Sequence, residues 1–187
     1  MTLMPGLIDV HGHLHFGTAT HPQRSWAHEI NLAYGVTTVH DPSADNDTVF
    51  ATAERIRAGL QLGPRIYSTG SVLYGAKSRG RAVIDSYEDA EFHIARLSDL
   101  GAISVKSYQQ PSRRQRQWLL EAAREGGLNV YTEGGGDFFS NIGMAIDGHT
   151  GVEHALPVAP IYRDVAELWA RTGTGYTPTL LVAYGGI

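Results

Sequence analysis

Residues 36–69, VTTVHDPSADNDTVFATAERIRAGLQLGPRIYST, set out one complete strand–helix–strand unit. The β-branched run Val36–Asp41 favours a buried strand. Apolar residues then recur at helical spacing from Asp47, a candidate N-cap, to Leu60. Gly63-Pro64 marks the entry into a second strand at residues 65–69. This spacing predicts a βαβ unit within a parallel sheet.

The same alternation continues in both directions along the chain. Seven parallel strands and six helices, joined by right-handed crossovers, fit a barrel better than an open sheet. A TIM barrel has eight such units and about 250 residues. The sequence therefore predicts one α/β domain over residues 1–187, an incomplete TIM-like (β/α)8 barrel whose eighth unit is missing. The other strands are expected at residues 7–14, 102–108, 128–133, 152–154 and 176–182, with helices at 23–34, 86–100, 112–125, 137–146 and 162–172.

Composition narrows the class of protein. The chain is 42% hydrophobic and 18% charged, which is typical of globular domains. Its net charge of −4 offers no basic footprint for nucleic acid or an anionic membrane. The absence of cysteine excludes disulfides, thiolate metal ligands and a cysteine nucleophile. No apolar run approaches the roughly 20 residues of a membrane span, and the localisation stays open.

Two histidines stand at the end of the first predicted strand. Alternate residues of a strand face the same side, so His11 and His13 are expected to point together, along with Asp9. Two imidazoles on a rigid strand are a natural start for a zinc site. The alternative is a pair of histidines in a polar loop, bonded to the backbone, and the spacing alone does not decide between them.

Lys106 lies within a strand that is expected to be covered on both faces. Burying an ammonium group is costly, so this lysine needs an anion, a lowered pKa or covalent modification. The alternative is an exposed lysine just beyond the strand end.

Three more polar residues occur at the ends of predicted strands, the face at which barrels carry their active sites. His154 ends the sixth strand. Glu133 ends the fifth, where a carboxylate either binds metal or caps the following helix. Tyr108 ends the predicted strand that contains Lys106 and is a candidate substrate-binding residue.

In combination these motifs resemble the amidohydrolase superfamily, in particular its imidazolonepropionase-like and prolidase-like branch. The stretch Met4–His13, MPGLIDVHGH, resembles the opening strand of that family. The pattern after Glu133 resembles the amidohydrolase modules that follow TolB-like propellers. Similar matches to the second, third, fourth, sixth and seventh strands occur in order at Gly35–Asp41, Gly63–Ile66, Val105–Ser107, Val152–His154 and Thr177–Leu180.

The resemblance implies a metal-dependent hydrolase of carbon–nitrogen bonds in a small-molecule amide, lactam or dipeptide. It implies that His11 and His13 bind a divalent metal, with zinc expected first and manganese next if Glu133 is a ligand. It also implies that carbon dioxide carbamylates Lys106, which then bridges two metals, and that His154 binds the second. A metal-activated water would attack the carbonyl carbon.

Two departures from the family pattern affect these expectations. Glu133 stands where the family usually has a metal-binding histidine, although a carboxylate is an acceptable ligand. The catalytic aspartate of the eighth strand and the flanking β-sandwich have no counterpart. We therefore expect a fragment, truncated at the C-terminus and at the N-terminus. Alone it would be nearly inactive, and it would pair with a second copy through its open barrel edge.

Two other functions remain open at this point. The chain is alternatively an inactive metal-binding barrel fragment, which the absent eighth strand favours. A phosphotriesterase-like hydrolase would use the same metal ligands, and only substrate profiling separates it from an amide hydrolase.

Overall fold

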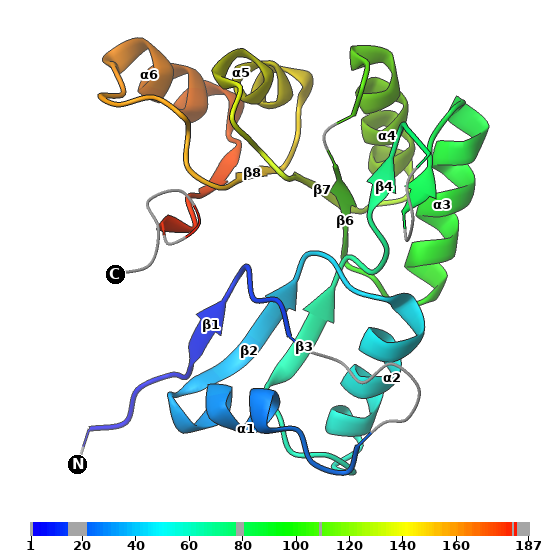
Figure 1. Cartoon of the computed structure of the whole chain (residues 1–187), viewed down its shortest axis with the longest axis vertical. Coiled ribbons are helices and arrows are strands. Elements are labelled where there is room, and N and C mark those ends of the chain that lie inside the picture. The colour runs from blue at the N-terminus through cyan, green and yellow to red at the C-terminus, as the bar shows by residue number, and fades with distance from the viewer. Residues whose placement is uncertain (1, 15–21, 78–80, 109, 181, 183–187) are drawn as a thin grey trace.

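All the paired strands of the described chain run parallel. The computed structural model describes residues 2–14, 22–77, 81–108, 110–180 and 182. One sheet has the order β1-β2-β3, and a second has the order β5-β4-β6-β7-β8-β9 (Figure 1). The strands are β1 (Leu7–Asp9), β2 (Val36–Asp41), β3 (Arg65–Ser68), β4 (Leu73–Tyr74), β5 (Ala82–Val83), β6 (Ser104–Ser107), β7 (Asn129–Thr132), β8 (Gly151–Glu153) and β9 (Gly175–Thr177).

Six helices of the described residues lie along the outer side of the strands (Figure 1). The longest have 13 residues, and none combines the length and apolar character that a membrane span requires. The helices are α1 (Trp26–Ala33), α2 (Asn46–Arg57), α3 (Tyr87–Asp99), α4 (Arg113–Glu125), α5 (Phe138–Asp147) and α6 (Arg163–Thr172).

The structure confirms an α/β fold with parallel sheets, as in part of a TIM-like barrel. The described strands divide between two sheets rather than forming the single seven-stranded sheet that the sequence suggested. The pair β4 and β5 was not expected, because two strands of two residues each leave no periodic pattern to detect.

The main hydrophobic core lies between the second sheet and helices α3 and α4. Val105 of β6 and Leu73 of β4 contribute its sheet side, and both are fully buried. Leu97 and Leu119 contribute its helix side. This core holds β6, the strand that carries Lys106, on a rigid support.

Several predicted strands are shorter in the structure, and the first and the last lose the most residues. The first ends at Asp9 rather than residue 14, because the Asp9 carboxylate accepts the backbone N–H of His11 at 3.0 Å and turns the chain. The last ends at Thr177 rather than Val182. Pro178 has no N–H to continue the ladder, and Leu180 lies in a helical segment instead.

The predicted N-cap of α2 was wrong by two residues. Asp45 is the N-cap, and its carboxylate accepts the backbone N–H of Thr48 at 3.2 Å, whereas Asp47 lies inside the first turn. We expect Asp45→Ala to lower the free energy of unfolding by about 1 kcal/mol. The matched variant Asp47→Ala should lower the free energy of unfolding by about 0.5 kcal/mol or less, because it loses only a favourable charge near the positive end of the helix dipole. Urea unfolding measures both, and an equal loss would contradict the assignment.

Candidate active site

Three histidines from the ends of β1 and β8 lie together. The ring centroid of His11 is 5.0 Å from that of His13 and 5.1 Å from that of His154. The side chain of His11 is 5% exposed and that of His13 is 56% exposed. The structure therefore brings together all three histidines that the sequence singled out.

The two neighbouring histidines do not owe their positions to strand alternation, which corrects the sequence argument. Both lie beyond the end of β1. The turn between them is held against β2, because the Gly12 N–H donates to the His40 carbonyl at 3.0 Å. A Cβ on Gly12 would lie only 2.8 Å from Val39 Cγ1, so the close approach requires glycine.

Lys106 is buried inside β6, with 1% of its side chain exposed. The alternative of an exposed lysine beyond the strand is therefore wrong. Its Nζ forms an ion pair with Glu133 Oε2 at 2.8 Å. The sequence left three ways to accommodate a buried lysine: an anion, a lowered pKa or covalent modification. The structure shows the anion.

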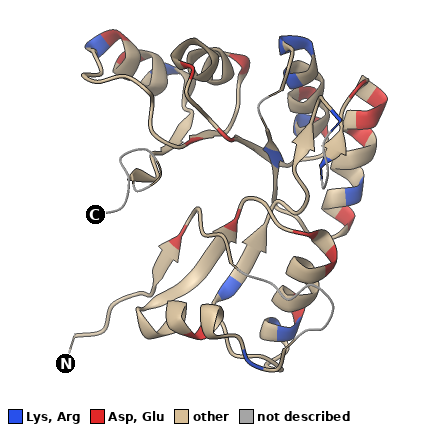
Figure 2. Ribbon diagram, viewed as in Figure 1, with Lys and Arg blue, Asp and Glu red and all other residues tan. Residues whose placement is uncertain are grey.

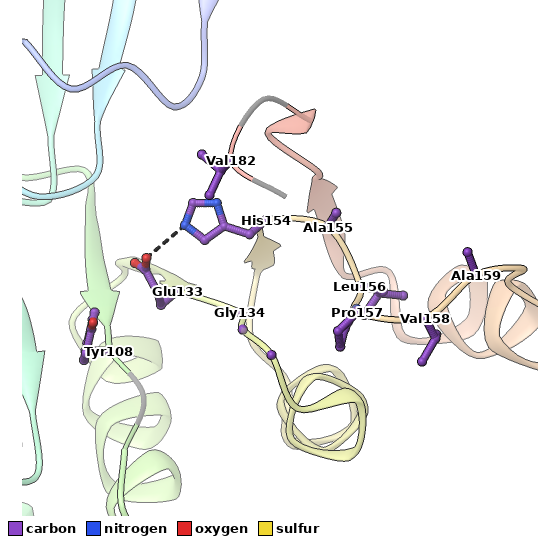
Figure 3. A pocket seen from close by; sticks show the side chains of 12 residues that line it. Tyr108, Glu133, Gly134, His154, Ala155, Leu156, Pro157, Val158, Ala159 and Val182 are labelled. Atoms are coloured by element: carbon purple, nitrogen blue, oxygen red, sulfur yellow. Dashed lines mark hydrogen bonds and ion pairs between the residues drawn. The ribbon is translucent and has the colours of Figure 1, made fainter. Parts of the chain in front are cut away.

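Glu133 links this lysine to the histidine cluster. Its second oxygen, Oε1, lies 2.9 Å from His154 Nε2 (Figure 3). His154 Nδ1 is in turn 2.5 Å from Thr179 Oγ1, beyond the end of β9. Burial raises the pKa of Glu133, but the positive charge of Lys106 and the contact with His154 outweigh burial, and the net pKa is lowered. Glu133 is thus held as a carboxylate between two nitrogen groups.

Asp41 at the end of β2 supports His13. It is buried and accepts the backbone N–H groups of Leu14 at 3.0 Å and Ser43 at 3.1 Å. His13 Nδ1 lies 3.4 Å from its Oδ1, and this contact raises the pKa of His13 despite partial burial.

His40 is a further histidine near the site. Burial lowers its pKa, and its Nε2 is 2.8 Å from Ser104 Oγ. Sequence reasoning missed Asp41, His40 and the buried Glu153. The only available signal was that each is a polar residue inside a predicted buried strand.

A cavity of about 550 Å³ opens beside Glu133 and His154. Tyr108 lies in its wall, where the sequence suggested a substrate contact. The Tyr108 ring also packs under the guanidinium of Arg81, 3.8 Å from the ring centroid. The opposite wall is apolar and glycine-rich (Figure 3), formed by residues 134–136, Ala155, Leu156, Pro157, Val158, Ala159 and Val182.

The predicted metal site and lysine carbamate stay predictions. Among the residues that the structure describes, no group of three His, Asp or Glu side chains has the geometry of a metal site. One nitrogen atom is nevertheless suited to an added cation. His11 Nε2 is buried, and it has no hydrogen-bond partner within the described chain. Lys106 Nζ is also buried, and its contact is the ion pair with Glu133.

Comparison with known proteins rests on structure. No family model matches the sequence, and no curated protein matches it either. A crystal structure of a Xaa-Pro dipeptidase with bound methionine has a TM-score of 0.71 and 18% identity, covering 94% of this chain and 53% of that one. The crystal structure of an amidohydrolase has a TM-score of 0.72 and 22% identity, and the match covers 95% of this chain and 54% of that one. The bottromycin amidohydrolase has a TM-score of 0.65 and 18% identity, covering 89% and 36%.

The chain spans about half the length of the first two of these structures and less of the third. Its likeness to them extends over almost all of its own residues. The α/β fold with parallel strands that the sequence motifs implied is therefore confirmed, and the chain has the fold of part of these amidohydrolase structures.

Proposed function

We propose that this chain carries the metal-binding part of a hydrolase site that cleaves carbon–nitrogen bonds in amides, lactams or dipeptides. The observation that carries the proposal is the position of His11, whose ring lies about 5 Å from those of both His13 and His154. The Lys106–Glu133 ion pair contacts the same cluster through His154.

The donor atoms fit a divalent cation. Imidazole nitrogens and a carboxylate suit zinc, and a larger share of carboxylate ligands would favour manganese. His11, His13 and His154 would hold the ion, with Glu133 as the oxygen ligand. A divalent cation here would polarise the substrate carbonyl and lower the pKa of water. The Nε2 of His11 adds support, because it is buried without a hydrogen-bond partner among the described residues, and such a nitrogen is costly.

Carbamylation of Lys106 would reverse its charge. The ammonium would first lose a proton to solvent. The resulting amine nitrogen would bond to the carbon of carbon dioxide and lose a second proton, leaving a carbamate. The product is an anion beside Glu133, so the attraction that now spans 2.8 Å would become repulsion. A divalent cation held at this site would offset that repulsion. Carbamylation and metal loading are therefore expected together.

The substrate would occupy the cavity beside Glu133 and His154. Tyr108 would contact it from one side. Leu156 and Val158 would contact it from the other, which favours a substrate with an apolar group near the cleaved bond.

The second candidate function is a metal-binding fragment that does not hydrolyse amides, and the histidine cluster fits it as well. This alternative predicts metal binding without hydrolysis, so a metal-loaded chain that turns over no amide would favour it.

Both candidate functions require a bound divalent metal, so the metal content of the protein tests both. We expect the purified protein to contain divalent metal, zinc first, when measured by plasma mass spectrometry. The double variant His11→Ala, His13→Ala should fall to background, because it loses two of three imidazole ligands. His93→Ala on α3 is the matched control and should keep the wild-type content. Equal metal in the double variant and the wild type would refute the assignment.

A further inference from the structure

A buried carboxylate at the C-terminal end of β8, in the second sheet, contacts His11. Glu153 is the last residue of β8, and its Oε2 lies 2.5 Å from His11 Nδ1. The Glu153 side chain is 3% exposed and that of His11 is 5% exposed. A carboxylate so withdrawn from water requires a strong partner.

This contact determines which nitrogen of the His11 ring carries the proton and which is left to bind a cation. Because the carboxylate only accepts, the bond places a proton on Nδ1. Nε2 is then the remaining nitrogen, and it is buried without a hydrogen-bond partner among the described residues. In a neutral ring, a proton on Nδ1 leaves Nε2 with a free lone pair.

We propose that Glu153 is a positioning residue, which fixes the tautomer and orientation of His11 so that Nε2 is presented to a divalent cation. The inference rests on the proposed function and adds a role that the metal ligands do not themselves supply. Carboxylates that accept from the second nitrogen of a ligating histidine orient the ring and increase its basicity.

The backbone around Glu153 is suited to this role. β8 is paired on both sides, with β7 and β9, and Glu153 is in register with Thr177. The chain after β7 passes so close that a Cβ on Gly134 would lie 1.9 Å from the Glu153 carbonyl oxygen. The carboxylate therefore projects from a fixed point. Asp41 makes a looser contact of the same kind with His13, at 3.4 Å.

The competing explanation is a plain ion pair that serves stability alone. Asp147 provides such a case in the same chain, because its buried carboxylate lies 2.6 Å from Arg113 Nε and 3.0 Å from Arg116 Nε. Figure 2 shows the basic start of α4, which carries these arginines, and the acidic end of α5. Asp147→Asn is thus the matched control for loss of a buried carboxylate that makes no contact with His11, His13 or His154.

The tautomer of His11 tests the inference without any metal. Nitrogen-15 NMR of the metal-free protein should show the His11 proton on Nδ1. In Glu153→Leu the proton should move to Nε2, because the acceptor is gone, whereas Glu153→Gln keeps an amide oxygen and should retain the Nδ1 proton. A wild-type ring protonated on Nε2, or on both nitrogens, would overturn the proposal.

Zinc affinity, measured by competition with a chromophoric chelator, gives the second readout. Glu153→Leu should weaken zinc binding by roughly 10- to 100-fold, and Glu153→Gln should recover part of that loss. Asp147→Asn should lower the metal-free melting temperature and leave zinc affinity unchanged. If the Glu153 variants lose thermal stability but bind zinc as the wild type does, Glu153 is structural and the proposal fails. A wild type that binds no zinc but shows the Nδ1 tautomer would refute the metal site while leaving the positioning of His11 intact.

Discussion

Replacing Lys106 with alanine in the active parent enzyme is expected to lower amide hydrolysis by roughly 10²- to 10³-fold, the size typical of removing one group that stabilises the transition state. The variant removes the only amine that a carbamate could occupy at the site. It also leaves Glu133 without its 2.8 Å cationic partner. Steady-state rates on a panel of amides and dipeptides measure the effect.

The sequence offers a matched control for this variant. Lys77 is its only other lysine, and it is exposed. Lys77→Ala should keep wild-type rates. Addition of a short carboxylic acid together with metal should restore part of the activity of Lys106→Ala, because the acid replaces the missing carbamate. Full activity in Lys106→Ala would show that the bridging role is wrong.

Gly134→Ala is expected to cost at least about 3 kcal/mol of unfolding free energy. Its φ of +64° is a left-handed conformation that costs an alanine about 1–2 kcal/mol. In addition, the new Cβ would lie 1.9 Å from the Glu153 carbonyl oxygen, so the backbone of β8 must shift. The cost therefore falls on the two strand ends that carry the site.

Gly136→Ala is the control in the same loop. A Cβ there meets nothing within 4 Å, and we expect a change of about 0.5 kcal/mol or less. Urea unfolding followed by circular dichroism compares the two variants. Equal stability of both would contradict the close approach of the loop to β8.

Elements with a strong local pattern could be predicted from sequence. β2 was predicted with its observed bounds, because a β-branched run packs as a buried strand wherever it lies. The position of Lys106 on a predicted strand left burial and exposure both open, and the structure shows that its side chain is buried. Helix α4 begins at Arg113, one residue after its predicted start, because Ser112 and Gln115 form a capping box.

The remaining features depend on contacts between distant parts of the chain. No local pattern shows that Glu153 would meet His11, 142 residues away. The end of β1 was misplaced because the side chain of Asp9 competes with the sheet for the N–H of His11. The pairing of Lys106 with Glu133 required the parallel register of β6 and β7.

Association of the isolated chain through its sheet edges stays a prediction. Within the described residues, β1 and β9 each pair on one side only. Leu7 and Ile8 of β1 are exposed. An unpaired strand edge with apolar side chains favours pairing with another chain. Size-exclusion chromatography measures the resulting oligomeric state.

The most direct test of the metal-dependent site is a crystal structure of the protein grown with zinc, with diffraction recorded on both sides of the zinc absorption edge. We predict an anomalous peak within ligand distance, about 2.0–2.2 Å, of His11 Nε2 and of at least two of His13, His154 and Glu133. We also predict extra density on Lys106 Nζ. A peak elsewhere, or none, with Lys106 still paired to Glu133, would contradict the account.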